Sequence, residues 1–159
     1  MKETAFITWK DTYSVGIPKI DEQHQELVQL TATLFAACMR GAESGRLYFK
    51  QVVHDLVQYV SFHFSAEERL MERIEFPGFA EHKKQHEQFV KKVLEDVKKF
   101  ESGQGIVPST FVRFLRDWIL THIAKEDQKY GDYLRYAKKE ALVADMFILA
   151  EPAKEEGPR

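Results

Sequence analysis

The stretch FAEHKKQHEQFVKKVLEDVKKF, residues 79–100, decides the fold. At about 100° per residue, an α-helix places His86, Phe89, Val93 and Phe100 within roughly 40° of His82. The lysine pairs of this stretch fall outside that stripe and are expected to face solvent: Lys83-Lys84, Lys91-Lys92 and Lys98-Lys99. The pattern predicts an amphipathic helix whose core-facing side carries two histidines.

Two other segments carry a histidine on an apolar stripe in the same way. Residues in phase with His24 are Val28, Thr31, Phe35 and Cys38. Residues in phase with His122 are Trp118, Leu115 and Phe111. In each segment we expect the histidine to face the core.

Helix-breaking residues separate four long segments, at about residues 21–40, 47–73, 79–100 and 108–130. Asp21 is expected to cap the first segment, and Gly41 and Gly45 to end it. Pro77-Gly78 and Ser102–Gly105 close the next two, and Pro108 suits the first turn of the last. Because short loops join neighbouring segments, we predict an all-α fold, an antiparallel up-down-up-down four-helix bundle. Residues 6–19 precede it as an irregular N-terminal arm.

The C-terminal part of the chain is less regular. Residues 131–149 predict a fifth, short helix through Ala141, Leu142, Ala144, Met146 and Phe147. Residues 151–159 are rich in proline, glycine and charge, which predicts a disordered tail. We therefore divide the chain into a bundle with its arm at 1–133, a C-terminal helical extension at 134–150 and a tail at 151–159.

Composition narrows the class of protein. The 159 residues suit one domain, and 23 basic against 25 acidic residues give a net charge of −2. Such a balance offers no electrostatic reason to expect nucleic acid or an anionic membrane as a partner. Cys38 is the single cysteine, and neither a signal peptide nor a run of 18 apolar residues is present. We expect a soluble cytoplasmic protein.

Helical phase selects candidate ligands among the remaining histidines and acids. His63 and Glu67 are four residues apart and share a face, as do His82 and His86. His54 lies about 180° from His63, and Glu68 about 140°, so both are expected to point elsewhere. After His122, Glu126 lies only about 40° off phase and Asp127 about 140°, unless a π-bulge brings Asp127 into line. The residues alone leave that choice open.

Five histidines on four apolar stripes predict a metal site. A single core histidine is usually satisfied by a neighbour, but burying five imidazoles without a metal would leave polar nitrogens unpaired. Five imidazoles with two carboxylates exceed the ligand set of a structural zinc and fit two iron ions. Lys83 replaces the glutamate that a zinc-peptidase motif needs, and the Glu-x-x-His signature of ferritin-like proteins is absent.

Taken in order, these residues resemble the hemerythrin family, specifically its single-domain bacterial members. The similarity covers about residues 6–133 and rests on these motifs: Trp9, Val15-Gly-Ile17, Ile20-Asp-Glu-Gln-His24, His63-Phe-Ser-Ala-Glu-Glu68, His82-Lys-Lys-Gln-His86 and His122-Ile-Ala-Lys-Glu-Asp127. Myohemerythrin, a relative, is a four-helix bundle.

The resemblance implies a pair of iron ions. One takes His82, His86 and His122, and the other takes His24 and His63. Glu67 and Asp127 bridge them together with a solvent-derived oxo or hydroxo group. The resemblance therefore favours Asp127 over Glu126, and it leaves an open coordination position on the second iron.

The implied function is reversible binding of dioxygen for storage, delivery or buffering, by a monomer that is not an enzyme. A dry pocket should surround the open position, and helical phase nominates five apolar residues for it: Phe62, Phe64, Trp118, Ile119 and Ile123. The alternative is an oxygen or redox sensor that binds a protein partner through its C-terminal segment.

Overall fold

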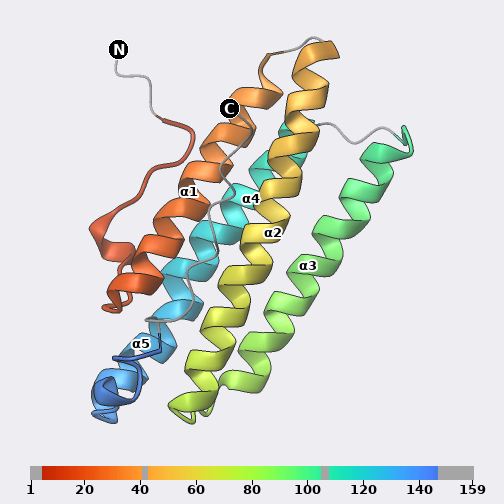
Figure 1. The fold of residues 1–159 in the computed structure, drawn as a ribbon. Coiled ribbons are helices and arrows are strands. Elements are labelled where there is room, and N and C mark those ends of the chain that lie inside the picture. Colours follow the sequence, from red (N-terminus) through yellow and green to blue (C-terminus); the bar gives the residue numbers. More distant parts are fainter. Residues whose placement is uncertain (1–4, 41–42, 105–107, 147–159) are drawn as a thin grey trace.

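The structure, a computed structural model, describes residues 5–40, 43–104 and 108–146. Its main helices are α1 (Pro18–Cys38), α2 (Glu43–Arg73), α3 (Phe79–Glu101) and α4 (Pro108–Thr121). A π-helical turn (His122–Asp127) joins α4 to α5 (Gln128–Tyr136) without a break. In Figure 1, α1, α2, α3 and α4 lie alongside one another and alternate in direction, with the N-terminal arm running beside α1. The predicted all-α, antiparallel four-helix bundle is confirmed, and the described residues contain no strand.

The first helix begins three residues earlier than predicted. Pro18 occupies its first position, where the missing N–H removes no intrahelical hydrogen bond, and Ile17 precedes it. Asp21 is therefore not the N-cap, and that prediction was wrong. Its carboxylate instead accepts hydrogen bonds from the Val15 N–H at 2.8 Å and the Ser14 hydroxyl at 2.6 Å. Asp21 thus ties the N-terminal arm to the bundle.

The C-terminal segment differs from the predicted fifth helix. α-Helical geometry stops at Tyr136 because Lys138 adopts a left-handed conformation, with φ of 54°. The Lys139 N–H then donates to the Leu134 carbonyl at 3.0 Å, which closes the helix end. A 3-10 helix (Glu140–Leu142) follows, so the expected helix through Ala141 and Met146 was wrong. Phe147, the end of the predicted extension and the tail at 151–159 lie outside the described residues.

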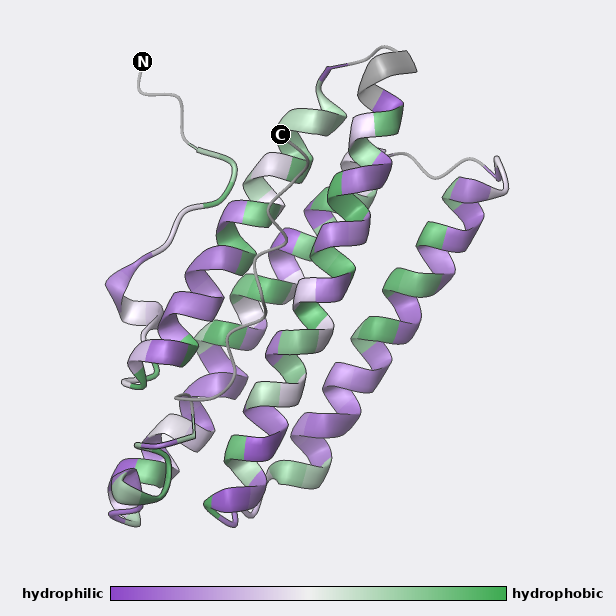
Figure 2. Cartoon of the chain, in the orientation of Figure 1, coloured by the Kyte–Doolittle hydropathy of each residue, from purple (hydrophilic) through white to green (hydrophobic). Residues whose placement is uncertain are grey.

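Two hydrophobic clusters fill the bundle. The larger one reaches from Ala37 and Phe49 at one end to Leu27, Phe64 and Ile123. The smaller one lies at the opposite end and joins the N-terminal arm, α2 and α5. Hydrophobic residues recur along every helix between hydrophilic ones (Figure 2). No helix in the described part of the chain has a stretch apolar enough to span a bilayer.

Gly131 allows the N-terminal arm to approach α5 closely. A Cβ atom at this position would lie 2.6 Å from the Val15 carbonyl oxygen. We expect Gly131→Ala to lower the free energy of unfolding by about 1–3 kcal/mol, because the arm must shift, despite the better helix propensity of alanine. Thermal denaturation followed by circular dichroism measures this loss. Gln25→Ala, at an exposed position of α1, should change the melting temperature little; equal melting temperatures for the two variants would contradict the close-packing argument.

Candidate metal centre

Seven buried side chains meet between the two hydrophobic clusters. Two groups of potential ligand atoms form there, each with all its atoms within 4.8 Å of one another. The first group contains Glu67, His82, His86, His122 and Asp127, and the second contains His24, His63, Glu67 and Asp127. The structure thus brings together all seven residues nominated from the sequence. His54 lies apart on the surface, beside Asp55 and Gln58.

The π-helical turn decides which acid faces the site. Asp127 follows His122 by five positions, and the wider π-turn brings both onto the same side. Asp127 is fully buried, and its Oδ1 atom lies 3.1 Å from Nε2 of His122. Glu126 points outward, where its carboxylate accepts hydrogen bonds from Lys129 at 2.7 Å and Gln85 at 3.3 Å. Ideal helical phase would have chosen the wrong acid.

Three imidazole nitrogens converge on one point. The Nε2 atoms of His82, His86 and His122 are each 3.1 Å from the other two. Three such atoms cannot all satisfy one another, because each pair needs one donor and one acceptor. At metal–nitrogen distances of about 2.0–2.1 Å, donors this far apart subtend an angle of roughly 95–102°, between a right angle and the tetrahedral angle. The spacing of the triad is therefore compatible with three imidazoles on one metal ion.

Three of the four carboxylate oxygens in the site lack a hydrogen-bond partner. Oε2 of Glu67, both oxygens of Asp127 and Nδ1 of His24 are buried without a hydrogen bond. Burial by itself would raise the pKa of both acids, but the surrounding histidines hold each pKa below its usual range. Burial likewise lowers the pKa of His24, yet Asp127 and Glu67 more than offset this and raise it to about 9. Ionised acids packed among imidazoles are the environment that a bound cation requires.

Hydrogen bonds to neighbouring polar residues orient two of the imidazoles. Nδ1 of His63 lies 2.9 Å from Oε1 of Gln23, and Nδ1 of His86 lies 3.1 Å from Oε1 of Glu68. If each Nδ1–H donates to that oxygen, the lone pair of Nε2 is left to face the centre. Sequence reasoning missed both partners, since Gln23 and Glu68 act across helices rather than along one.

Tyr130 is a third residue that the sequence did not nominate. Its hydroxyl is fully buried and donates a hydrogen bond of 2.6 Å to Oε1 of Glu67. Burial and the nearby charges of Glu67 and Asp127 raise the pKa of Tyr130 well above its usual value, so the hydroxyl keeps its proton. Tyr130 therefore holds Glu67 in one orientation.

We expect Tyr130→Phe to weaken iron binding by about 10–100-fold, the usual effect of losing a group that orients a metal ligand. Competition with a chelator of known affinity measures this change. Tyr136→Phe, on the same helix but 88% exposed, is the matched control and should bind iron like the parent protein. Unchanged affinity in both variants would remove Tyr130 from the site.

Aromatic rings cover the histidine triad. The ring of Phe64 stacks on His86 with centroids 3.7 Å apart, and Trp118 stacks on His122 at 4.3 Å. A small apolar cavity lies beside the site, between Phe64, Trp118, Ile119 and Ile123, with Leu27, Val60 and Phe89 completing its walls. Phe62, the fifth residue expected there, does not line it. Phe62 precedes His63 by one position, which turns it about 100° away and against Tyr59.

Comparisons with known proteins agree with this geometry. A family model described as the hemerythrin HHE cation binding domain matches residues 15–134. The bacteriohemerythrin of Stenotrophomonas maltophilia is 34% identical over 133 residues, which cover 82% of this chain and 83% of that protein. This chain belongs to the hemerythrin family. The predicted resemblance is therefore confirmed.

Other hemerythrins support the same conclusion. The bacteriohemerythrin of Methylococcus capsulatus is 30% identical over 131 residues, or 82% of this chain and 98% of that protein. A crystal structure of wild-type hemerythrin superposes with a TM-score of 0.75 at 30% identity, covering 80% of this chain and 97% of the other. Membership of this family, with the buried histidines and acids, supports the expected class of iron-containing, oxygen-binding protein. Hemerythrins are oxygen-binding proteins rather than enzymes.

Proposed function

We propose that this hemerythrin binds dioxygen reversibly at a pair of iron ions held by the seven buried side chains. His82, His86 and His122 would hold one ion, and His24 and His63 the other. Glu67 and Asp127, with a solvent-derived oxygen, would bridge them. The observation that carries this proposal is that the two groups of ligand atoms share both carboxylates.

The two proposed ion sites are unequal. One offers three imidazoles and the two shared acids, while the other offers only two imidazoles and the same acids. With a bridging oxygen, the first set is complete at six ligands and the second is one short. Iron supplies the electrons and the open position that dioxygen needs. His63 of the incomplete set lines the apolar cavity, as do His122 and Asp127, so the proposed centre borders space that water does not favour.

The protein's own residues keep that space dry and the ligands fixed. Phe64, Ile119 and Ile123 are at most 6% exposed, and they form part of the cavity wall. Keeping water and its protons away from the site is what reversible binding would require of these residues. Hydrogen bonds restrain three of the proposed ligands: Gln23 holds His63, Glu68 holds His86, and Tyr130 holds Glu67.

Optical spectra of the iron-loaded protein test the proposal. We expect a visible charge-transfer band that appears with oxygen, vanishes under argon and returns over repeated cycles. Replacing His63 by leucine should abolish the band, and replacing the exposed His54 by leucine should leave it intact. Bleaching to a ferric form on first contact with air, without recovery, would contradict reversible binding.

One structural observation favours oxygen carriage over the sensor alternative. The described part of the C-terminal segment is anchored to its own bundle, although Tyr136 and Leu142 stay exposed. Val143 is only 7% exposed, Arg73 donates a hydrogen bond to the Leu142 carbonyl, and Arg73 also lies 3.3 Å from Asp145. These contacts tie the segment to α2, so a partner that needed the whole segment would have to displace it.

A further inference from the structure

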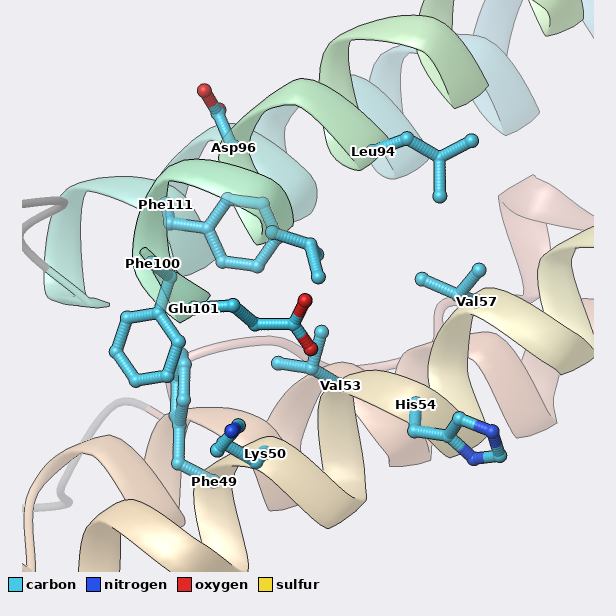
Figure 3. Close-up of a pocket in the computed structure, with 11 residues that line it drawn as sticks. Phe49, Lys50, Val53, His54, Val57, Leu94, Asp96, Phe100, Glu101 and Phe111 are labelled. Carbon is cyan, nitrogen blue, oxygen red and sulfur yellow. The ribbon is translucent and has the colours of Figure 1, made fainter. Parts of the chain in front are cut away.

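A pocket opens between α2 and α3 in the half of the bundle away from the metal centre. Its volume is about 180 Å³, and α4 contributes Phe111 to its floor. Figure 3 shows Phe49 and Phe100 at one end of the pocket and Val57 and Leu94 at the other. Since α2 runs from Phe49 through Val57 to His63, the Val57–Leu94 end is the one nearer to the metal centre.

Two smaller cavities continue from this pocket into the bundle. The middle cavity shares Val57 and Leu94 with the pocket and is otherwise lined mainly by aliphatic residues. It shares Val60 and Phe89 in turn with the inner cavity beside His63, His122 and Asp127. The two inner cavities are small, about 10 Å³ each, and with the pocket they form a row of spaces with common walls between the surface and the metal centre.

We propose that dioxygen reaches the metal centre from the α2–α3 pocket through this series of cavities. The inference rests on the proposed function. Dioxygen is small and apolar, so it partitions into apolar cavities that water avoids. Val57 lines both the pocket and the middle cavity, and Val60 lines both the middle and the inner cavity. Rotation of these two side chains would let a diatomic molecule pass from one space to the next.

A groove between α3 and α4 is the competing route. It is wider, about 490 Å³, and its floor includes Phe89, Trp118 and His122, which also line the inner cavity. Stacked rings form that floor, however. The ring centroids of Phe89 and Trp118 are 3.9 Å apart, and those of Trp118 and His122 are 4.3 Å apart. His122 is fixed as a ligand in our proposal, so the rings stacked on it resist displacement. The groove is also lined by the polar residues Gln85, Gln88 and Glu126.

The two routes can be distinguished by placing a phenylalanine side chain in each. Val57→Phe narrows the passage between the pocket and the middle cavity, and Gln88→Phe fills the α3–α4 groove. We expect Val57→Phe to slow dioxygen association and dissociation by the same factor, about fivefold, with equilibrium affinity and optical spectrum unchanged. Val57→Ala should accelerate both rates, and Gln88→Phe should alter neither. Stopped-flow mixing and flash photolysis give these rates.

Three results would overturn the route. They are a changed dioxygen affinity in Val57→Phe, unaltered association and dissociation rates in Val57→Phe, and slower rates in Gln88→Phe alone. Xenon provides a readout that does not depend on oxygen chemistry. Crystals of the iron-loaded protein under xenon pressure should show the gas in the α2–α3 pocket beside Val57 and Leu94, and an empty pocket would count against the proposal. If the parent protein bound no dioxygen, the proposed function would fail, whereas normal binding with unchanged rates would reject only the route.

Discussion

Replacing Asp127 by asparagine should remove most of the bound iron from this protein. Asp127 is shared by both groups of ligand atoms, and its oxygens lie 3.1–3.2 Å from Nε2 of His24, His82 and His122. Asparagine keeps the shape but removes the negative charge that a buried cation needs, a loss that costs about 3–5 kcal/mol when one partner of a buried charged pair is deleted. Iron analysis of purified protein measures the result directly.

Glu126→Gln is the matched control for that experiment. Glu126 is the neighbouring acid, and ideal helical phase would have chosen it, yet it faces Gln85 and Lys129. We expect this variant to retain its full iron content. Iron loss in Glu126→Gln with retention in Asp127→Asn would show that the backbone near Lys125 does not form the π-helical turn.

Removing iron from the parent protein should lower its melting temperature by roughly 10 °C or more. Without a cation, the fully buried Glu67 and Asp127 face each other with imidazoles and the Tyr130 hydroxyl as their compensation. Protons on His24 and His82, each with its pKa raised to about 9, replace part of the lost charge. A stability loss of about 5 kcal/mol is the scale of an uncompensated buried charge, and in a chain of this size it corresponds to at least 10 °C.

Calorimetry before and after chelation measures this loss, with ferrous iron added back as the control. Full recovery on reloading shows that the loss reflects the missing metal and not irreversible damage. Equal melting temperatures with and without iron would mean that the buried acids do not depend on a cation, which contradicts the account of the site.

Much of this site could be predicted because the periodicity of a single helix fixes which of its residues share a face. His63 with Glu67, and His82 with His86, are single-helix pairs four residues apart, so the position of one fixes the face of the other. The same rule placed His54 on the surface. Apolar stripes through His24 and His122 then predicted which faces meet in the core.

Other features depend on contacts between distant segments, which periodicity does not report. Gln23 and Tyr130 act on residues of α2, and their own helices give no sign of it. Lys138 ends its helix in a left-handed turn although it is not glycine, so the fifth helix was misjudged. Asp127 needed a change in backbone geometry, and only the family resemblance favoured it in advance.

The most direct test of the central claim is the stoichiometry of reversible oxygen uptake. Iron-loaded, reduced protein should take up one dioxygen per two iron ions in a closed oxygen-electrode cell. The same amount should be released when the solution is flushed with argon. Uptake of one dioxygen per iron, or consumption without release, would contradict a paired iron centre that binds oxygen reversibly.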